Sequence, residues 1–228
     1  MNRVINVMRM QLINRWIFIG IPLIILAASF LVTLIIWSFL PDGGGRLSGG
    51  SQAVMWYFFA LGIQSLTLTF PFSQGLSITR RTFFLGTLAL FSVIALITSV
   101  TYYLLGIVEQ ATGGWGVDGR FFALDWIANG PWYHPIVFYF AVMMALFLVG
   151  FWAATIYKRW QTSGLLVAGI SVALLLVGTL YLIGSRNAWG EVGAFLGSQS
   201  QLNVAGWLAV LALALAGGSF LTLRRAEP

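Results

Sequence analysis

Residues 16–40 read WIFIGIPLIILAASFLVTLIIWSFL, a stretch without a single charged side chain. A helix needs about 20 apolar residues to cross the hydrocarbon core of a bilayer, which is about 30 Å thick. The stretch does not alternate between polar and apolar residues, as a strand of a membrane barrel would. Because backbone groups cannot stay unpaired in lipid, we predict a membrane-spanning helix here.

Five further uncharged stretches follow this one, and each is long enough to cross a bilayer. The chain is 59% hydrophobic and 8% charged, whereas a soluble domain carries about 25% charged residues. We therefore expect an all-α integral membrane fold in which residues 1–228 form a single transmembrane domain. The six predicted spans cover about residues 16–40, 53–76, 82–108, 135–157, 164–184 and 204–223.

Basic residues gather in alternate connections between these spans. The larger group consists of Arg3, Arg9, Arg15, Arg80, Arg81, Lys158, Arg159, Arg224 and Arg225, and the smaller of Arg46, Arg120 and Arg186. Positively charged loops stay in the cytoplasm, so the larger group and both chain termini are predicted to be cytoplasmic. Since the basic residues flank apolar segments, topology explains the net charge of +6 and no nucleic-acid partner is expected.

The segment before the first span has helical periodicity. Val4, Ile5, Met8, Leu12 and Trp16 recur at helical spacing, which predicts a basic amphipathic helix over residues 1–15 that lies at the membrane interface. Val7, Met10 and Ile13 interrupt the polar face. The alternative is a simple cytoplasmic extension of the first span.

The three outer connections differ in character. Residues 41–52 are rich in glycine and predict a flexible turn, and residues 109–134 carry many aromatic side chains, which suits a cap at headgroup level. Residues 185–203 contain a short apolar piece, Trp189 to Leu196, between helices five and six. This piece is a candidate re-entrant segment, which would require protein neighbours within the membrane.

Catalytic and ATP-binding motifs are absent from the sequence. The only lysine, Lys158, lacks the glycines of a phosphate-binding loop, and a single histidine, His134, cannot form a zinc motif. We therefore expect no enzyme activity, metal or cofactor in this chain, and a structural role for His134. The carboxylates Glu109, Asp118, Asp125 and Glu191 fall in outer connections, where we interpret them as a solvated rim.

No span carries an ionisable residue at its middle, which argues against ion-coupled transport. The polarity that remains is weaker, and it has two interpretations: hydrogen bonds between helices, or the lining of a translocation path. The candidates for a path are Gln64, Ser65, Thr67, Thr69 and Thr98.

One segment, Phe70 to Thr87, reads FPFSQGLSITRRTFFLGT. It resembles the segment that joins the second and third helices in permease subunits of bacterial type-2 ABC exporters. Such segments read roughly Gly-hydrophobic-Ser/Gly-x-Thr-Arg-Arg-x-x-Phe-hydrophobic-Gly, and the matching residues here are Gly75, Thr79, Arg80, Arg81, Phe84 and Gly86. The layout of the whole chain is also similar, although the outer connection 109–134 is longer than in many relatives.

This resemblance implies a multi-pass protein of the bacterial plasma membrane that exports a hydrophobic or amphipathic substrate, such as a peptide or a lipid-like compound. It also implies a second permease chain, identical or different, and cytosolic ATPase subunits that bind ATP and magnesium. The residues expected near the ATPase are Ser77, Thr79, Arg80, Arg81, Lys158 and Arg159. Two alternatives stay open: a sensor or assembly partner that does not transport, and a substrate-capturing subunit of an importer.

Overall fold

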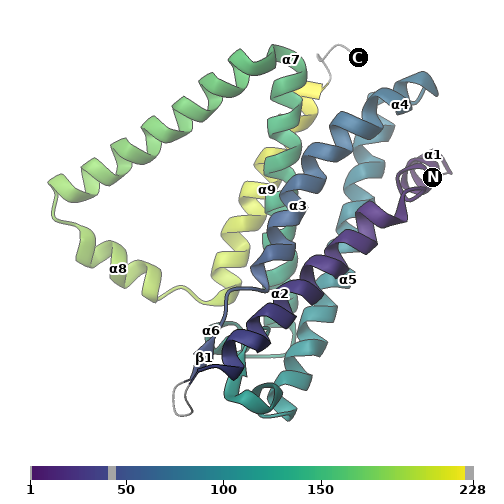
Figure 1. The fold of residues 1–228 in the computed structure, drawn as a ribbon. Helices are drawn as coiled ribbons and strands as arrows, with labels where there is room; N and C mark the ends of the chain where they lie inside the picture. The colour runs from purple at the N-terminus through teal and green to yellow at the C-terminus, as the bar shows by residue number, and fades with distance from the viewer. Residues whose placement is uncertain (1, 41–44, 224–228) are drawn as a thin grey trace.

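The computed structural model describes residues 2–40 and 45–223, and Figure 1 shows that they form a bundle of long helices with one helical arm beside it. Among these residues, five helices are long and apolar enough to cross a membrane. The first consists of η1 (Trp16–Gly20) and α2 (Ile21–Ser38), and the second of α3 (Gln52–Gln64), η2 (Ser65–Thr69) and α4 (Phe70–Gly75). The other three are single elements: α5 (Arg80–Ala111), α7 (Tyr133–Ser185) and α9 (Gln201–Leu223).

Six separate spans were predicted, and this number is not confirmed. Residues 157–163, where an inner turn was expected, lie within the single element α7. Its helical backbone is broken at Gln161, with φ 56° and ψ −152°. This is a left-handed conformation that residues other than glycine rarely adopt. The fourth and fifth predicted spans are therefore the two parts of α7 on either side of Gln161.

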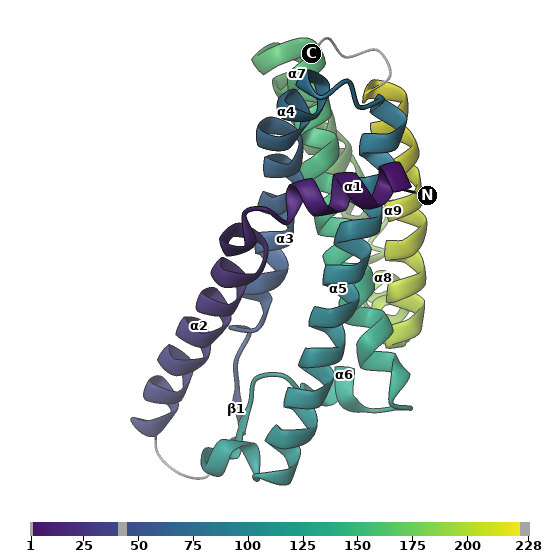
Figure 2. The same cartoon turned by 90° about the vertical axis from the view of Figure 1, so that its right-hand side faces the viewer.

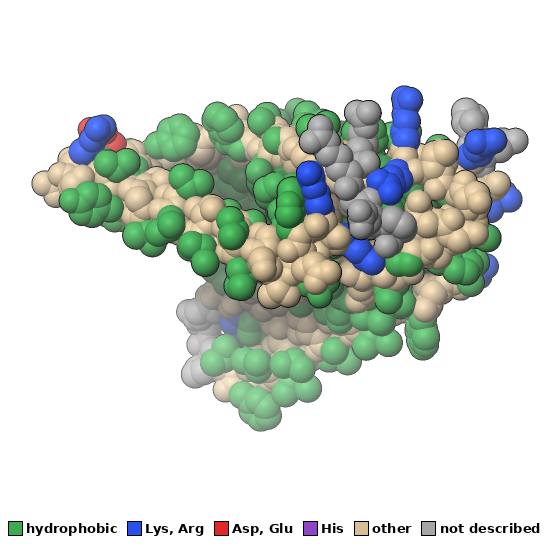
Figure 3. Space-filling model, turned by 90° about the horizontal axis from the view of Figure 1, so that it is seen from above, with side chains coloured by type: hydrophobic (Ala, Val, Ile, Leu, Met, Phe, Trp, Pro, Cys, Tyr) green, Lys and Arg blue, Asp and Glu red, His purple; other side chains and the backbone are tan. Residues whose placement is uncertain are grey.

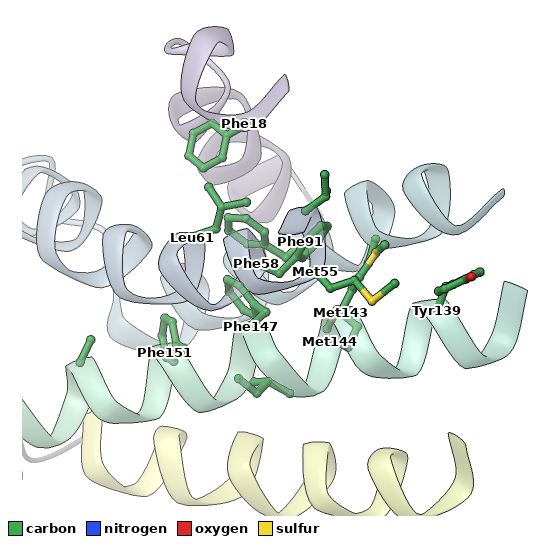
Figure 4. Packing of buried hydrophobic residues seen from close by; sticks show 14 of the residues in the cluster. Phe18, Met55, Phe58, Leu61, Phe91, Tyr139, Met143, Met144, Phe147 and Phe151 are labelled. Carbon is green, nitrogen blue, oxygen red and sulfur yellow. The ribbon is translucent and has the colours of Figure 1, made fainter. Parts of the chain in front are cut away.

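The first part of α7 is the centre of the bundle and contacts α3, α5 and α9. Helices α3 and α7 approach very closely, because a Cβ atom on Gly62 would lie 2.1 Å from the carbonyl oxygen of Phe147. Phe91 of α5 stacks on Phe147 with ring centroids 4.1 Å apart. Figure 4 shows these rings together with Phe58 and Phe151, so the core of the bundle is largely aromatic.

Helix α1 (Asn2–Gln11) packs on α5 rather than standing alone. Val7, which interrupted the predicted polar face, is fully buried, and a Cβ atom on Gly86 would lie 2.7 Å from the Cβ of Val7. Two residues of the predicted apolar face point away, since Ile5 is 39% and Trp16 69% exposed. The helix is shorter than the predicted 1–15, and Figure 2 shows it crossing α5. Its most buried residues, Val7 and Gln11, are not on the predicted apolar face, of which Val4, Met8 and Leu12 are half-buried.

The first two of the three outer connections form one cap, at the end of the bundle opposite α4. Strand β1 (Arg46–Leu47) pairs in parallel with β2 (Gly119–Arg120), so residues 45–50 are more than the flexible turn expected for 41–52. Residues 41–44 lie outside the described residues. The cap also contains η3 (Gly114–Asp118) and α6 (Asp125–Ala128). Trp37 of α2 lies against Gly119, where a Cβ atom would be 2.2 Å from the indole ring.

The second part of α7 and the short helix α8 (Trp189–Gly197) leave the bundle as an arm, residues 162–200 (Figure 1). Every side chain from 169 to 182 is exposed. The predicted apolar piece Trp189 to Leu196 is the helix α8, and it contains no buried residue. Helix α9 then returns to the bundle and packs on the first part of α7.

Candidate functional site

The turn between α4 and α5, residues 76–79, holds two of the residues predicted to contact an ATPase. Its shape is fixed by internal hydrogen bonds: the Ile78 amide donates to the Ser73 carbonyl at 3.1 Å, and the Gln74 amide group donates to the Ile78 carbonyl at 3.2 Å. The Thr79 hydroxyl caps α5 by accepting from the Thr82 amide at 3.3 Å. Ser77, with φ 54°, and Thr79 are exposed. The turn is therefore an ordered surface.

The two adjacent arginines have different surroundings. Arg80 is half-buried, and its Nη1 donates to the carbonyl of Leu223 at 3.3 Å, which ties the start of α5 to the end of α9. Arg81 is exposed. The structure thus gives Arg80 a structural contact and leaves Arg81 facing outward.

Lys158 and Arg159 lie at the end of the first part of α7, just before the break at Gln161. Both are half-buried, and the Arg159 guanidinium lies 4.2 Å from the centre of the Trp160 ring. The break and the 76–79 turn lie towards the same end of the molecule in Figure 1. Viewed from this end, Figure 3 shows several basic side chains over the bundle.

A cavity of about 440 Å³ opens beside the 76–79 turn. One wall is the turn together with Thr82, and the other is α1 through Arg3, Asn6 and Met10. Sequence reasoning placed α1 at the membrane interface and did not bring it to this turn. The sequence signal for the packing of α1 on α5 was Val7 together with Gly86, because a small residue such as glycine allows a crossing helix to pack closely.

Comparison of the chain with models of known protein families, with curated proteins and with solved structures finds no match. The chemistry of the site therefore rests on its own residues.

The residues predicted for a translocation path lie on α3, η2 and α5, and their hydroxyl groups bond within their own helices. Ser65 donates to the Gly62 carbonyl, Thr67 to Ile63, Thr69 to Ser65 and Thr98 to Ile94. Bonds of this kind satisfy a hydroxyl group in an apolar environment without a partner helix. The side-chain oxygen of Gln64 is buried and has no hydrogen-bond partner among the described residues. Path lining stays a prediction for these five residues.

A buried polar contact between helices was missed. Gln11 of α1 is 2% exposed, and its amide nitrogen donates to the hydroxyl of Thr87 at 2.8 Å and to that of Thr69 at 3.4 Å. The contact joins α1 to α5 and to η2. It holds α1 against α5 and against η2, which continues into α4 and the 76–79 turn. The sequence offers no spacing rule that would have paired residues so far apart.

The interpretation of the four outer carboxylates as a solvated rim is wrong for Glu109. Asp118, Asp125 and Glu191 are exposed, but Glu109 is completely buried. Its Oε2 accepts from the Trp115 indole at 2.7 Å and from the amides of Phe121 and Phe122 at 2.9 and 3.0 Å, while its Oε1 accepts from the Ala123 amide at 2.9 Å. A carboxylate with several N–H donors is well compensated for burial. Glu109 is therefore the anchor of the cap.

The Gly-rich run after α5 lets the chain fold back over this carboxylate. Residues 113–116 all have positive φ, with values of 62°, 71°, 64° and 75°. Three of them are glycines, and a Cβ atom on Gly114 would lie 2.4 Å from the amide nitrogen of Gly119. In the sequence, the signal for the burial of Glu109 was the glycine-rich run that follows it, because such a run can form a concavity lined by N–H groups that binds an anion.

Proposed function

We propose that this chain is the membrane-spanning permease subunit of an ATP-driven exporter of the type-2 ABC class, located in a bacterial plasma membrane. Cytosolic ATPase subunits supply the energy, and a second permease chain completes the path. The substrate class is hydrophobic or amphipathic, such as a peptide or a lipid-like compound. In this proposal the two parts of α7 are the fourth and fifth of six spans, α8 is re-entrant, and both termini are cytoplasmic.

The observation that carries the proposal is the segment 70–87. It resembles the exporter segment in sequence, and in the structure it forms an ordered turn at the end of the bundle where basic side chains gather. The turn joins α4 to α5, and α4 continues α3 and η2, which together carry four path candidates, while α5 carries the fifth. Displacement of the turn would therefore move the helices that carry the path candidates on both sides of it.

Helix α1 supports the same mechanism. It forms one wall of the cavity beside the turn, and Gln11 hydrogen-bonds to both η2 and α5. A partner element that fills the cavity would contact α1 and the turn together. Motion of an ATPase subunit would then move α1, η2 and α5 as a connected unit, since packed elements transmit displacement.

The test is substrate-dependent ATP hydrolysis by the chain reconstituted with the ATPase subunit that co-purifies with it. We expect R81A to lower this stimulation about tenfold, the effect of losing a contact of about 1.4 kcal/mol, without loss of folded protein. R80A should lower both stimulation and stability, because Arg80 also bonds to Leu223.

The control is R120A, which removes a basic residue at the opposite end, where Arg120 pairs with Asp125 at 3.1 Å. It should leave stimulation unchanged. Unchanged stimulation in R81A, or a chain that never associates with an ATPase, would reject the proposed contact.

A second candidate, a ligand-capturing subunit of an importer, is favoured by one cavity. It measures about 200 Å³, lies at the cap end, and is lined by Tyr102, Tyr103, Phe122, Trp132 and Tyr139 among others. Pockets rich in aromatic side chains with a few polar groups are typical of small-molecule sites. Native mass spectrometry of the purified chain distinguishes this candidate, because it requires a small ligand retained in a one-to-one ratio.

A further inference from the structure

The cavity of about 200 Å³ at the cap end lies where α5 ends and α7 begins. Figure 2 shows α6, which lines it with Ile127 and Ala128, beside the last turns of α5. Both α5 and α7 are long and apolar enough to cross a membrane, and in a membrane their ends lie at the level of the lipid headgroups. Trp132 lines the cavity and is 66% exposed. The mouth of the cavity is therefore open to the headgroup region and to the water beyond it.

Aromatic rings form much of the wall of this cavity. They belong to Tyr102, Tyr103, Phe122, Trp132 and Tyr139. The hydroxyl groups of Tyr102 and Tyr139 donate to the backbone carbonyls of Ser51 and Phe122, each at 2.7 Å. These two tyrosines therefore offer a ligand their rings and not their O–H groups. Ring faces carry a negative electrostatic potential, so such a wall favours a cation.

A buried negative charge lies directly behind this wall. Glu109 belongs to the same turn of α5 as Gly106 and Gln110, which line the cavity. Its carboxylate accepts from the amides of Phe122 and Ala123, which also line the cavity. Its hydrogen-bond partners among the described residues are N–H donors, which stabilise the ionised form. A charge that lies away from water acts on a neighbouring cavity with little screening.

No positive side chain compensates this charge from within the cavity. Among the described residues that line it, none is a lysine or an arginine. In the cap, Arg120 pairs with Asp125 at 3.1 Å and Arg46 donates to the carbonyl of Val117 at 2.8 Å. The two helix ends at the cavity oppose each other, because the end of α5 is negative and the start of α7 positive by about half a charge each. The full charge of Glu109 therefore decides the sign of the field.

We propose that this cavity binds an organic ammonium cation, such as the trimethylammonium group of choline or of a choline lipid. Aromatic walls suit a quaternary ammonium group, which has no N–H that needs an acceptor. The volume of about 200 Å³ admits such a group but not a drug-sized molecule, whose sites measure about 300–1,000 Å³. The site goes beyond the proposed function, because its ligand chemistry is the same whether the chain exports a substrate or captures one.

The test is calorimetric titration of the full chain, purified in a maltoside detergent without any ATPase or nucleotide. The two probes are choline and its neutral carbon analogue, in which a tert-butyl group replaces the trimethylammonium group. We expect choline to bind at least about tenfold more tightly, since the two probes share a shape and differ in charge. Equal affinity for the two probes, or no saturable binding of choline, would overturn the inference.

A pair of tryptophan variants locates the bound choline. W132L removes an aromatic ring at the mouth of the cavity and should weaken choline binding about tenfold without loss of folded protein. W126L is the matched control, because Trp126 is another exposed tryptophan of the cap but lines a different cavity between α3, α7 and α9. It should leave choline binding unchanged. Unchanged binding in W132L would place choline outside this cavity and would reject the site.

Nanodiscs distinguish a lipid headgroup from a free cation as the occupant. Free choline should bind more weakly in phosphatidylcholine than in phosphatidylglycerol nanodiscs if the headgroup enters the cavity. Equal binding in the two lipids assigns the site to free ammonium compounds. Since no ATPase is present, failure of these experiments leaves the R81A test unaffected, and failure of that test leaves the cation site standing.

Discussion

Glu109 is the residue whose environment differs most from its expected one. Its two oxygens accept from the Trp115 indole and from the amides of Phe121, Phe122 and Ala123, and it is completely buried. In E109Q an NH₂ group replaces one oxygen, so at least one of these N–H groups faces another donor. A buried donor left without an acceptor costs about 1–3 kcal/mol. We expect E109Q to lower the free energy of unfolding by about 3 kcal/mol, measured in detergent by thermal or denaturant unfolding.

The matched control for this prediction is D125N. Asp125 pairs with Arg120, but its side chain is 69% exposed, and exposed ion pairs contribute about 0–1 kcal/mol. D125N should change the free energy of unfolding by less than about 1 kcal/mol. Equal losses in the two variants would show that Glu109 does not anchor the cap.

The sequence could place Glu109 in the outer connection but could not show that it is buried. A charged residue at the end of an apolar stretch is usually solvated. Burial depends on whether the following backbone can turn its N–H groups inward, and here the positive φ values of residues 113–116 allow this. The sequence is equally unable to distinguish Arg80 from Arg81, which are adjacent. Arg80 bonds to the end of α9 and Arg81 is exposed, and this difference depends on where α9 ends in space.

At the scale of elements, the contact between α1 and α5 is the most specific packing feature at the turn. An alanine at position 86 would place its Cβ 2.7 Å from the Cβ of Val7 and 3.2 Å from the Val4 carbonyl oxygen. Overpacking of this kind costs about 1–3 kcal/mol. We expect G86A to loosen α1, lower the free energy of unfolding by about 2 kcal/mol, and expose Arg9 and Arg15 to faster trypsin cleavage.

The double variant V7G/G86A exchanges which helix carries the Cβ atom. Residues in contact show coupling energies of about 0.5–3 kcal/mol. The double variant should therefore lose about 1 kcal/mol less free energy of unfolding than the two single variants lose together. G206A is the control, because a Cβ atom on Gly206 in α9 would meet nothing within 4 Å. Strict additivity of V7G and G86A would contradict the packing of α1 on α5.

Sequence patterns were most informative for the long apolar elements. The predicted spans 16–40, 53–76, 82–108 and 204–223 correspond to elements that begin and end within four residues of those bounds. The pattern was less informative where two apolar stretches are joined by few polar residues, because Lys158 to Thr162 can continue a helix as well as end one. The break in α7 depends on the backbone of Gln161 alone. The α1–α5 contact and the pairing of β1 with β2 are long-range, and no local periodicity encodes them.

The whole molecule is a bundle whose two ends differ in chemistry. At one end, the basic residues Arg80, Arg81, Lys158 and Arg159 follow the turn or precede the break in α7. At the other end, the cap holds both signs of charge: Arg46 and Arg120 beside Glu109, Asp118 and Asp125. Helices α3 and α5 pack on the first part of α7. Helix α2 reaches the cap, where its Phe30 ring packs against Trp115 and Phe121 with centroids 4.8 and 5.3 Å apart. The cap and the basic end are thus connected by continuous helices.

This polarity predicts the orientation of the chain in a cell, because the end rich in basic residues stays in the cytoplasm. The absence of cysteine allows single cysteines to report it, and Ser77 and Asn129 are exposed at the basic end and at the cap end. In intact cells, a charged maleimide that cannot cross membranes should label N129C and should label S77C only after permeabilisation. Both proteins should be labelled equally once the membrane is opened, which controls for local reactivity. Labelling of S77C from outside intact cells would place the turn away from any cytosolic ATPase and would reject the proposed function.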